Sequence, residues 1–243
     1  MKLDTGKLAI PAEIPHLSRP RLLNILQGSL ASCCATIING RAGTGKTTLG
    51  ADFAQRCNRS VAWYKVDATD SRLAVFLEYL IASVEYERQG FGAKTRKHFS
   101  EKLDEFSLCK LVEAFAYDLE SEVKPLLLIL DDLHLIYDAE WFSPFLHRLL
   151  PLLPTEVHLL ILGRGLPPAP LWRLRSKQRL SVINEEMLAF TQSEAEELFS
   201  RYGLNKEQAK IAFEQTGGRA DDLHARAIRR WSPISEFKYG LVV

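Results

Sequence analysis

A glycine-rich segment near the start of the chain has the residue types and spacing of a phosphate-binding loop. Residues 40–47 read Gly-Arg-Ala-Gly-Thr-Gly-Lys-Thr and match the Walker A pattern GxxxxGK[ST] between a predicted strand and a predicted helix. Glycines allow positive φ angles, so that backbone N–H groups close around a phosphate at the positive end of the helix dipole. The loop residues expected to bind a nucleotide are Gly40, Ala42, Gly43, Thr44, Gly45, Lys46, Thr47 and Thr48.

Three side chains at the end of this loop have distinct predicted roles. Lys46 would act in catalysis as a positive charge that bridges the β- and γ-phosphates. Thr47 would place its hydroxyl group on Mg²⁺. Thr48 would reach the α-phosphate, and the alternative is that it faces solvent or caps the helix. The segment therefore predicts a nucleoside triphosphate and Mg²⁺ as ligands.

A pair of carboxylates follows a strand further along the chain. The apolar run Leu126–Leu130 ends in Asp131 and Asp132, which is the arrangement of a Walker B motif. Asp131 would hold the magnesium shell through water, and Asp132 would orient and polarise the attacking water. The alternative is that adjacent acids only cap a turn. His134 is expected to be structural rather than a proton carrier.

An arginine follows another buried strand. His158–Leu162 is apolar and is followed by Gly163-Arg164-Gly165. Strand ends of open α/β sheets are where ligands bind, so Arg164 is placed to sense the γ-phosphate. A surface arginine is the alternative interpretation.

Short apolar runs alternate with longer amphipathic segments, which is typical of an α/β fold with a parallel sheet. Leu73, Phe76, Leu77, Leu80, Ile81 and Val84, for example, recur at helical spacing and are expected to be core residues. The predicted strands are residues 34–39, 61–66, 126–130, 158–162 and 180–183. The predicted helices between them are residues 46–57, 71–87, 94–120 and 139–152.

Beyond Asn184 only helical segments are predicted, at residues 191–202, 205–216 and 219–231. Thr191 and Glu194 form a capping box, and Gly217-Gly218 forms a helix stop. We therefore expect a nucleotide-binding domain over residues 1–187 and a small helical domain over residues 188–243.

The composition excludes several classes of protein. The 243 residues include 31 Lys+Arg and 30 Asp+Glu, and 47% are hydrophobic, which excludes disordered, collagenous and disulfide-scaffold chains. A net charge of +1 argues against a dedicated nucleic-acid-binding domain. No signal peptide or spanning segment is visible, so a cytoplasmic protein without membrane contact is expected. The four cysteines lack metal-ligand spacing and are expected to be small buried thiols.

Several segments together resemble the nucleotide-binding domain of MalT-like, LuxR-family transcriptional regulators, which belong to the STAND signal-transduction ATPases. The similar segments are Ile14–Leu26, Ala42–Ala54, Val61–Val84, Leu126–Ile136, Leu146–Arg164 and Leu188–Phe199. The resemblance implies a P-loop NTPase with a five-stranded parallel sheet of order 5-1-4-3-2, flanked by helices. It also implies ATP or ADP as the nucleotide, places Arg19 near the adenine, and favours the sensor role of Arg164.

Two departures from that family stand out. Where the family has an EGWPAGL-type turn with a proline near the base, this chain has residues 217–223, which lack the proline. Arg219 in this segment is a candidate second phosphate sensor, with a plain helix-start residue as the alternative. The chain also stops at Val243, so DNA contact is expected only through a domain absent from this chain.

The first functional hypothesis is an Mg-ATP-dependent switch domain of a transcriptional regulator, with slow hydrolysis and self-association in the ATP state. ATP would shift a closed-to-open equilibrium between the two domains. The second is a stand-alone hydrolase or phosphotransferase, with the segment Pro167–Arg179 as a lid. The third is an interaction module that holds ADP without turnover.

Overall fold

The structure is a computed structural model that describes residues 3–12, 17–99, 105–122 and 124–229, without the side chains of residues 172 and 173. The chain divides into two compact units. The first comprises Met1–Ala42 and Lys46–Met187, and the second comprises Gly43–Gly45 and Leu188–Val243. The first unit contains the sheet.

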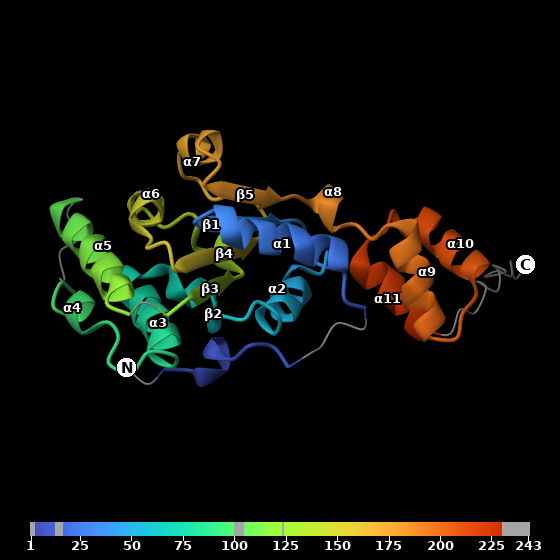
Figure 1. Cartoon of the computed structure of the whole chain (residues 1–243), viewed down its shortest axis with the longest axis horizontal. Coiled ribbons are helices and arrows are strands. Elements are labelled where there is room, and N and C mark those ends of the chain that lie inside the picture. Colours follow the sequence, from blue (N-terminus) through green and yellow to red (C-terminus); the bar gives the residue numbers. More distant parts are fainter. Residues whose placement is uncertain (1–2, 13–16, 100–104, 123, 230–243) are drawn as a thin grey trace, which may run out of the picture. The chain divides into compact units, whose positions relative to one another are not determined.

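The sheet has five parallel strands in the order β2-β3-β4-β1-β5 (Figure 1). The strands are β1 (Ala35–Asn39), β2 (Ser60–Lys65), β3 (Leu126–Asp131), β4 (Val157–Gly163) and β5 (Leu180–Ile183). The predicted fold class and strand order are therefore confirmed, and every predicted strand is present within one residue at each end.

The apolar strands form because both faces of the sheet are covered. Every residue of β3 and β4 is buried, as expected for central parallel strands. Asn39 pairs with Gly163, and Lys65 pairs with Asp131. Because all five strands run the same way, the segments that follow β1, β3 and β4 meet at one edge of the sheet.

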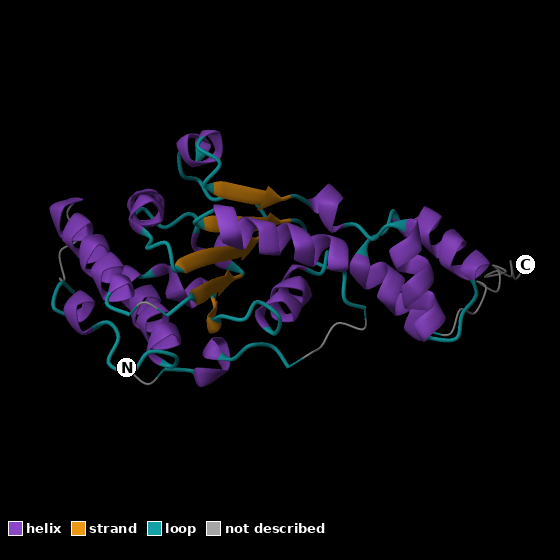
Figure 2. Cartoon of the chain, in the orientation of Figure 1, coloured by secondary structure: helices purple, strands orange, loops and turns teal. Residues whose placement is uncertain are grey.

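Helices connect and flank these strands (Figure 2). In the first unit they are α1 (Pro20–Ser32), α2 (Lys46–Ala54), α3 (Leu73–Glu85), α4 (Ala93–Arg96), α5 (Glu105–Glu120), α6 (Phe142–Leu152), α7 (Trp172–Ser176) and α8 (Glu185–Leu188). Short 3₁₀ turns occupy Thr5–Leu8, Ala68–Ser71 and Leu133–Ile136. Sequence analysis did not predict α1, although Pro20 at its first turn and the buried Leu22, Leu26 and Leu30 at helical spacing are a readable signal.

The prediction of one helix over residues 94–120 is wrong. The chain forms the short α4 and then, beyond residues outside the described part, α5. The backbone N–H and hydroxyl of Thr95 donate to the Asp118 carboxylate at 2.9 and 2.7 Å. This contact packs α4 against α5. Because it joins residues that are 23 positions apart, the helical periodicity of the sequence does not show that the chain folds back between them.

A buried polar network ties α1 to the sheet. The Thr36 hydroxyl lies 2.5 Å from the Ser29 hydroxyl and 2.9 Å from His158 Nε2. His158 Nδ1 lies 3.0 Å from the Cys33 carbonyl oxygen, which can only accept, so Nδ1 carries the proton and Nε2 accepts from Thr36. Burial lowers the pKa of His158 to about 4, and the ring is therefore neutral at physiological pH.

The described part of the chain beyond β5 contains only helices and loops (Figure 2). After α8 come α9 (Gln192–Arg201), α10 (Lys206–Thr216) and α11 (Ala220–Ile228). The predicted capping box of Thr191 and Glu194 is present, and Gly217 adopts the left-handed conformation that ends α10. Residues 230 and 231 of the last predicted helix lie outside the described residues.

None of the helices that the structure describes has both the length and the apolar composition needed to cross a bilayer. Over the same residues all four cysteines are free thiols; Cys34 and Cys57 are buried and the other two are half-buried.

Candidate functional site

The glycine-rich loop lies between β1 and the first turn of α2, as the sequence predicts. Gly43 and Gly45 have φ angles of +77° and +81°, which side chains rarely tolerate. The Gly40 N–H donates to the Gly163 carbonyl at 3.2 Å, so the loop starts directly beside the end of β4. This contact places the loop next to the segment that carries Arg164.

Lys46 is buried at the first position of α2. Its ammonium group donates to the carbonyl oxygens of Gly40 and Arg41, both at 2.7 Å. Burial lowers its pKa, while the carboxylates of Asp132 and Asp131 oppose that effect. The lysine thus sits inside the curve of the loop, where a phosphate would compete for the same ammonium group.

The Thr47 hydroxyl and the end of β3 form the most specific contact of the site. Thr47 Oγ1 donates to the Asp131 carboxylate, with 3.0 and 3.1 Å to the two oxygens. Burial, and next the charge of Asp132, raise the pKa of Asp131 to about 6, although the hydrogen bonds from Thr47 and from the Asp132 N–H lower it. The predicted partners of a magnesium ion therefore lie side by side.

Asp132 has a left-handed backbone, with φ 55° and ψ 27°. Aspartate tolerates this conformation better than most residues, and backbone strain of this kind is concentrated at functional sites. Its carboxylate lies 3.9 Å from His134 Nδ1. Burial lowers the pKa of His134, the Asp132 carboxylate opposes that effect, and the cations Arg164 and Lys46 add to it. His134 is therefore neutral at physiological pH.

Arg164 immediately follows β4 and is exposed. Its charge lowers the pKa of Lys46 and of His134, which places the guanidinium within electrostatic range of both. The loop, the acidic pair and the arginine thus converge at the carboxyl edge of the sheet, on three neighbouring strands.

The donor set suits Mg²⁺ that also has phosphate and water ligands. A hydroxyl and a carboxylate oxygen are the hard ligands that this ion prefers, and it commonly takes only one or two of them from protein. No cluster of three or more His, Cys, Asp or Glu side chains suited to a metal occurs within residues 3–12, 17–99, 105–122 and 124–229. Thr47 and Asp131 would therefore hold the ion together with the nucleotide.

The remaining predicted residues occupy different surroundings. Ala42 and Thr48 are exposed, whereas Thr44 is buried. Arg19 is buried immediately before α1, and the neighbouring Ser18 hydroxyl donates to Asp52 of α2 at 2.6 Å. That bond holds the segment of Arg19 against the helix of the phosphate loop. Arg219, in the second unit, forms an ion pair with Asp222 at 3.5 Å.

Sequence analysis missed two residues that support the loop. Glu185, in α8 directly after β5, accepts from the Arg41 N–H and from the Arg41 guanidinium, each at 2.7 Å. Asp52 joins Ser18 to Arg56, which donates to it at 2.7 Å. Asp52 lies one helical turn before Arg56, and this spacing could have predicted their ion pair. The contact of Glu185 with Arg41 spans 144 residues, and no local sequence pattern indicates it.

Comparison with known proteins agrees with this architecture. The sequence matches the AAA ATPase domain family over residues 19–162. It is 31% identical over 202 residues to the HTH-type transcriptional regulator MalT of Cronobacter sakazakii and 33% identical over 198 residues to that of Serratia proteamaculans. Each alignment covers 81% of this chain but only 22% of the regulator.

Among solved structures, the chain is similar to a Signal Transduction ATPase with Numerous Domains (STAND) protein with a tetratricopeptide repeat sensor from Pyrococcus horikoshii. The TM-score is 0.52 at 14% identity, over 96% of this chain and 35% of that one. At such low identity the likeness concerns the fold alone. The family match and the two regulators confirm the resemblance found in the sequence: the chain belongs to the AAA ATPase domain family and is a MalT-like P-loop ATPase domain.

Proposed function

We propose that this domain binds ATP with Mg²⁺, hydrolyses it slowly, and acts as a nucleotide-controlled switch. The observation that carries the proposal is the contact of Thr47 Oγ1 with both Asp131 carboxylate oxygens, beside the buried ammonium group of Lys46. A hydroxyl, a carboxylate and a lysine that converge at one helix start are the groups that phosphoryl transfer requires.

Each residue has one task in this proposal. Lys46 leaves the carbonyl oxygens of Gly40 and Arg41 to contact the β- and γ-phosphates. Thr47 and, through water, Asp131 would hold Mg²⁺, which would neutralise charge on the phosphates. Asp132 orients the attacking water, and Arg164 senses the γ-phosphate. Arg19 lies near the adenine.

The switch part of the proposal follows the relatives. MalT is named as a transcriptional regulator, and the Pyrococcus protein as a signal-transduction ATPase. We infer by analogy that the ATP state of this domain, comprising an ATPase part over residues 1–187 and a helical part over residues 188–243, favours self-association in the cytoplasm. DNA would be contacted only by a separate domain.

Steady-state phosphate release from ATP tests the chemistry. We expect slow, Mg²⁺-dependent release that falls at least about 100-fold in Lys46→Ala and in Asp132→Asn, because both act on the transition state. Asparagine tolerates the left-handed backbone that Asp132 adopts, so we expect Asp132→Asn to change the charge and keep the local conformation. Turnover untouched by Lys46→Ala would refute the phosphate-site assignment.

The same assay distinguishes the alternatives. ADP production that depends on an added small-molecule acceptor would show a phosphotransferase instead. Tightly held ADP with no turnover would show an interaction module. Mg-ATP turnover in the wild type together with sedimentation that depends on the nucleotide supports the switch.

A further inference from the structure

A tyrosine that follows the short turn after β3 reaches across to the segment that carries Arg164. The Tyr137 hydroxyl group donates to the carbonyl oxygen of Gly165 at 3.2 Å. Gly165 directly follows Arg164, and both lie beyond Gly163, the last residue of β4, where the sheet no longer fixes the backbone. The tyrosine therefore provides a fixed point one residue beyond the arginine.

The same hydroxyl group also closes the space beside Gly163. A Cβ atom at Gly163 would lie 3.0 Å from the Tyr137 hydroxyl oxygen, which is closer than most contacts of such an atom. The Gly163 carbonyl accepts from the Gly40 N–H at the start of the phosphate loop. Both neighbours of Arg164 therefore lie against the Tyr137 hydroxyl group, and one of them also contacts the loop.

The tyrosine is held in place on its own side. Its ring packs on Phe142, the first residue of α6, with 5.1 Å between the ring centroids. Its backbone N–H donates to the carbonyl oxygen of His134, within the turn that follows the acidic pair. Burial raises the pKa of the Tyr137 hydroxyl group, which therefore stays protonated and able to donate at physiological pH.

This bond links the ends of two neighbouring strands. Tyr137 belongs to the segment after β3, which ends in Asp131, whereas Gly165 belongs to the segment after β4. A nucleotide at the phosphate loop would have to meet the carboxylates of the first segment and the arginine of the second at the same time. The tyrosine fixes the spacing between those two segments.

We propose that Tyr137 is a positioning residue for Arg164 and so sets how strongly the site prefers a nucleoside triphosphate to a diphosphate. Arg164 is exposed, and binding must fix a long side chain that has many rotamers. A backbone that is already held on both sides of the arginine lowers that cost, which is the usual benefit of preorganisation. The inference rests on the γ-phosphate-sensing role of Arg164 in the proposed function.

Calorimetric titration of the full chain tests this role. The ligands are ADP and the non-hydrolysable β,γ-imido analogue of ATP, each with Mg²⁺, and the ratio of the two dissociation constants measures the preference for the third phosphate. Tyr137→Phe removes the hydroxyl group and keeps the ring on Phe142. We expect it to weaken binding of the ATP analogue about threefold to tenfold, the range of one hydrogen bond. Binding of ADP should not change, which also shows that the variant is folded.

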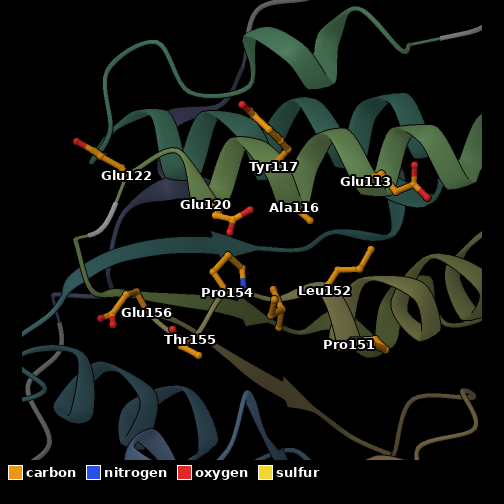
Figure 3. Close-up of a pocket in the computed structure, with 11 residues that line it drawn as sticks. Glu113, Ala116, Tyr117, Glu120, Glu122, Pro151, Leu152, Pro154, Thr155 and Glu156 are labelled. Carbon is orange, nitrogen blue, oxygen red and sulfur yellow. The ribbon is translucent and has the colours of Figure 1, made fainter.

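Two other tyrosines give matched controls. Tyr79→Phe also removes a hydroxyl group bonded to the backbone, because Tyr79 accepts from the Asp4 N–H at 3.1 Å. Tyr117→Phe removes a hydroxyl group from the groove between α5 and the residues that precede β4, at the opposite end of that strand from Arg164 (Figure 3). Both controls should keep the wild-type preference for the ATP analogue.

A double-mutant cycle separates positioning of the arginine from a general effect on the site. Arg164→Ala alone should reduce the preference for the ATP analogue. In that background Tyr137→Phe should cause no further loss, because the hydroxyl group acts through the arginine.

Gly163→Ala provides an independent variant. Its added methyl group should displace the Tyr137 hydroxyl group and weaken binding of the ATP analogue. The same substitution should have a much smaller effect in Tyr137→Phe, which lacks the oxygen that the methyl group would meet.

Other results would overturn the inference. If Arg164→Ala loses the preference and Tyr137→Phe keeps it, the sensor role stands and only the positioning role is wrong. If Tyr137→Phe weakens ADP binding equally, or has its full effect in Arg164→Ala, the hydroxyl group does not act through the arginine. If Arg164→Ala keeps the full preference, the sensor role fails and the positioning role fails with it, while the effect of Lys46→Ala on phosphate release still judges the phosphate site.

Discussion

Because the Asp131 carboxyl group is buried, we expect its negative charge to lower the free energy of unfolding of this protein. Burial raises the pKa of this group from its ordinary value of 3.8 to about 6, so the folded protein resists ionising it. At neutral pH the group is nonetheless charged. We therefore expect Asp131→Asn to make the protein more stable in the absence of nucleotide, because the amide has similar shape and carries no charge. Its side-chain oxygen can still accept from Thr47.

The magnitude follows from the two pKa values. Each tenfold change in proton affinity corresponds to about 1.36 kcal/mol, so the rise from 3.8 to about 6 costs the folded state about 3 kcal/mol when the carboxyl group is ionised. For a domain of this size, 1 kcal/mol changes the melting temperature by about 2–4 °C. The variant should therefore melt at most roughly 6–12 °C higher at neutral pH.

The pH dependence identifies the cause. Between about pH 4 and pH 6 the folded state holds the Asp131 proton more tightly than the unfolded state, so this group lowers stability as pH rises through that range. The advantage of Asp131→Asn should be near zero below about pH 3, still small at pH 4, and reach its full value above about pH 7. Urea unfolding at several pH values measures it, with Asp138→Asn, which changes an exposed carboxylate, as the control.

Two results would refute this reasoning. If Asp131→Asn is less stable than the wild type at pH 7.5, the ionised carboxylate stabilises the fold through Thr47 and the Asp132 N–H more than burial opposes it. If the advantage is the same at every pH, it does not arise from ionisation. With Mg-ATP the order should reverse, because the wild type alone retains the carboxylate expected to bind the ion.

Four further predictions follow from described contacts. His158, whose pKa is lowered to about 4, contributes a loss of stability as pH falls from 6.5 to 4, so His158→Gln should gain stability relative to the wild type over that range in urea unfolding; a difference that does not change with pH would mean that the ring is already charged. Glu185→Gln should weaken ATP binding about three- to tenfold in fluorescence titrations, because the loop loses the ionic part of its contact with Arg41; unchanged affinity would show that the loop holds its shape alone. Thr191→Ala should destabilise the start of α9 by about 1 kcal/mol in amide hydrogen exchange, with Ser193→Ala as an exposed control; equal exchange in both variants would contradict a capping role. Asp52→Ala should weaken ATP binding and leave turnover at saturation unchanged, because it removes the acceptor of the Ser18 hydroxyl and so releases the segment of Arg19; unchanged affinity would show that this bond does not hold the segment.

Short-range patterns were sufficient to predict much of the fold. Short β-branched or continuously apolar runs predicted all five strands. The pattern is clearest in the central strands β3 and β4, because a parallel strand buried on both faces has no polar alternation. The strand order came from the family resemblance. The long helix predicted over residues 94–120 failed because the contact of Thr95 with Asp118 depends on two segments folding back on each other.

Local sequence patterns were sufficient to predict the groups of the candidate site, which are a glycine-rich loop that ends in Lys46 and Thr47 and a strand that ends in Asp131 and Asp132. Each depends on neighbours within a few residues, where spacing alone dictates backbone geometry. The tertiary structure decided the rest. It brought Thr47 to 3.0 Å from Asp131, placed Glu185 on the loop, and buried the carboxyl group so that its pKa rises to about 6. These properties depend on the distance between segments that are far apart in the sequence and on the removal of water from their side chains. A local sequence pattern encodes neither the distance nor the burial.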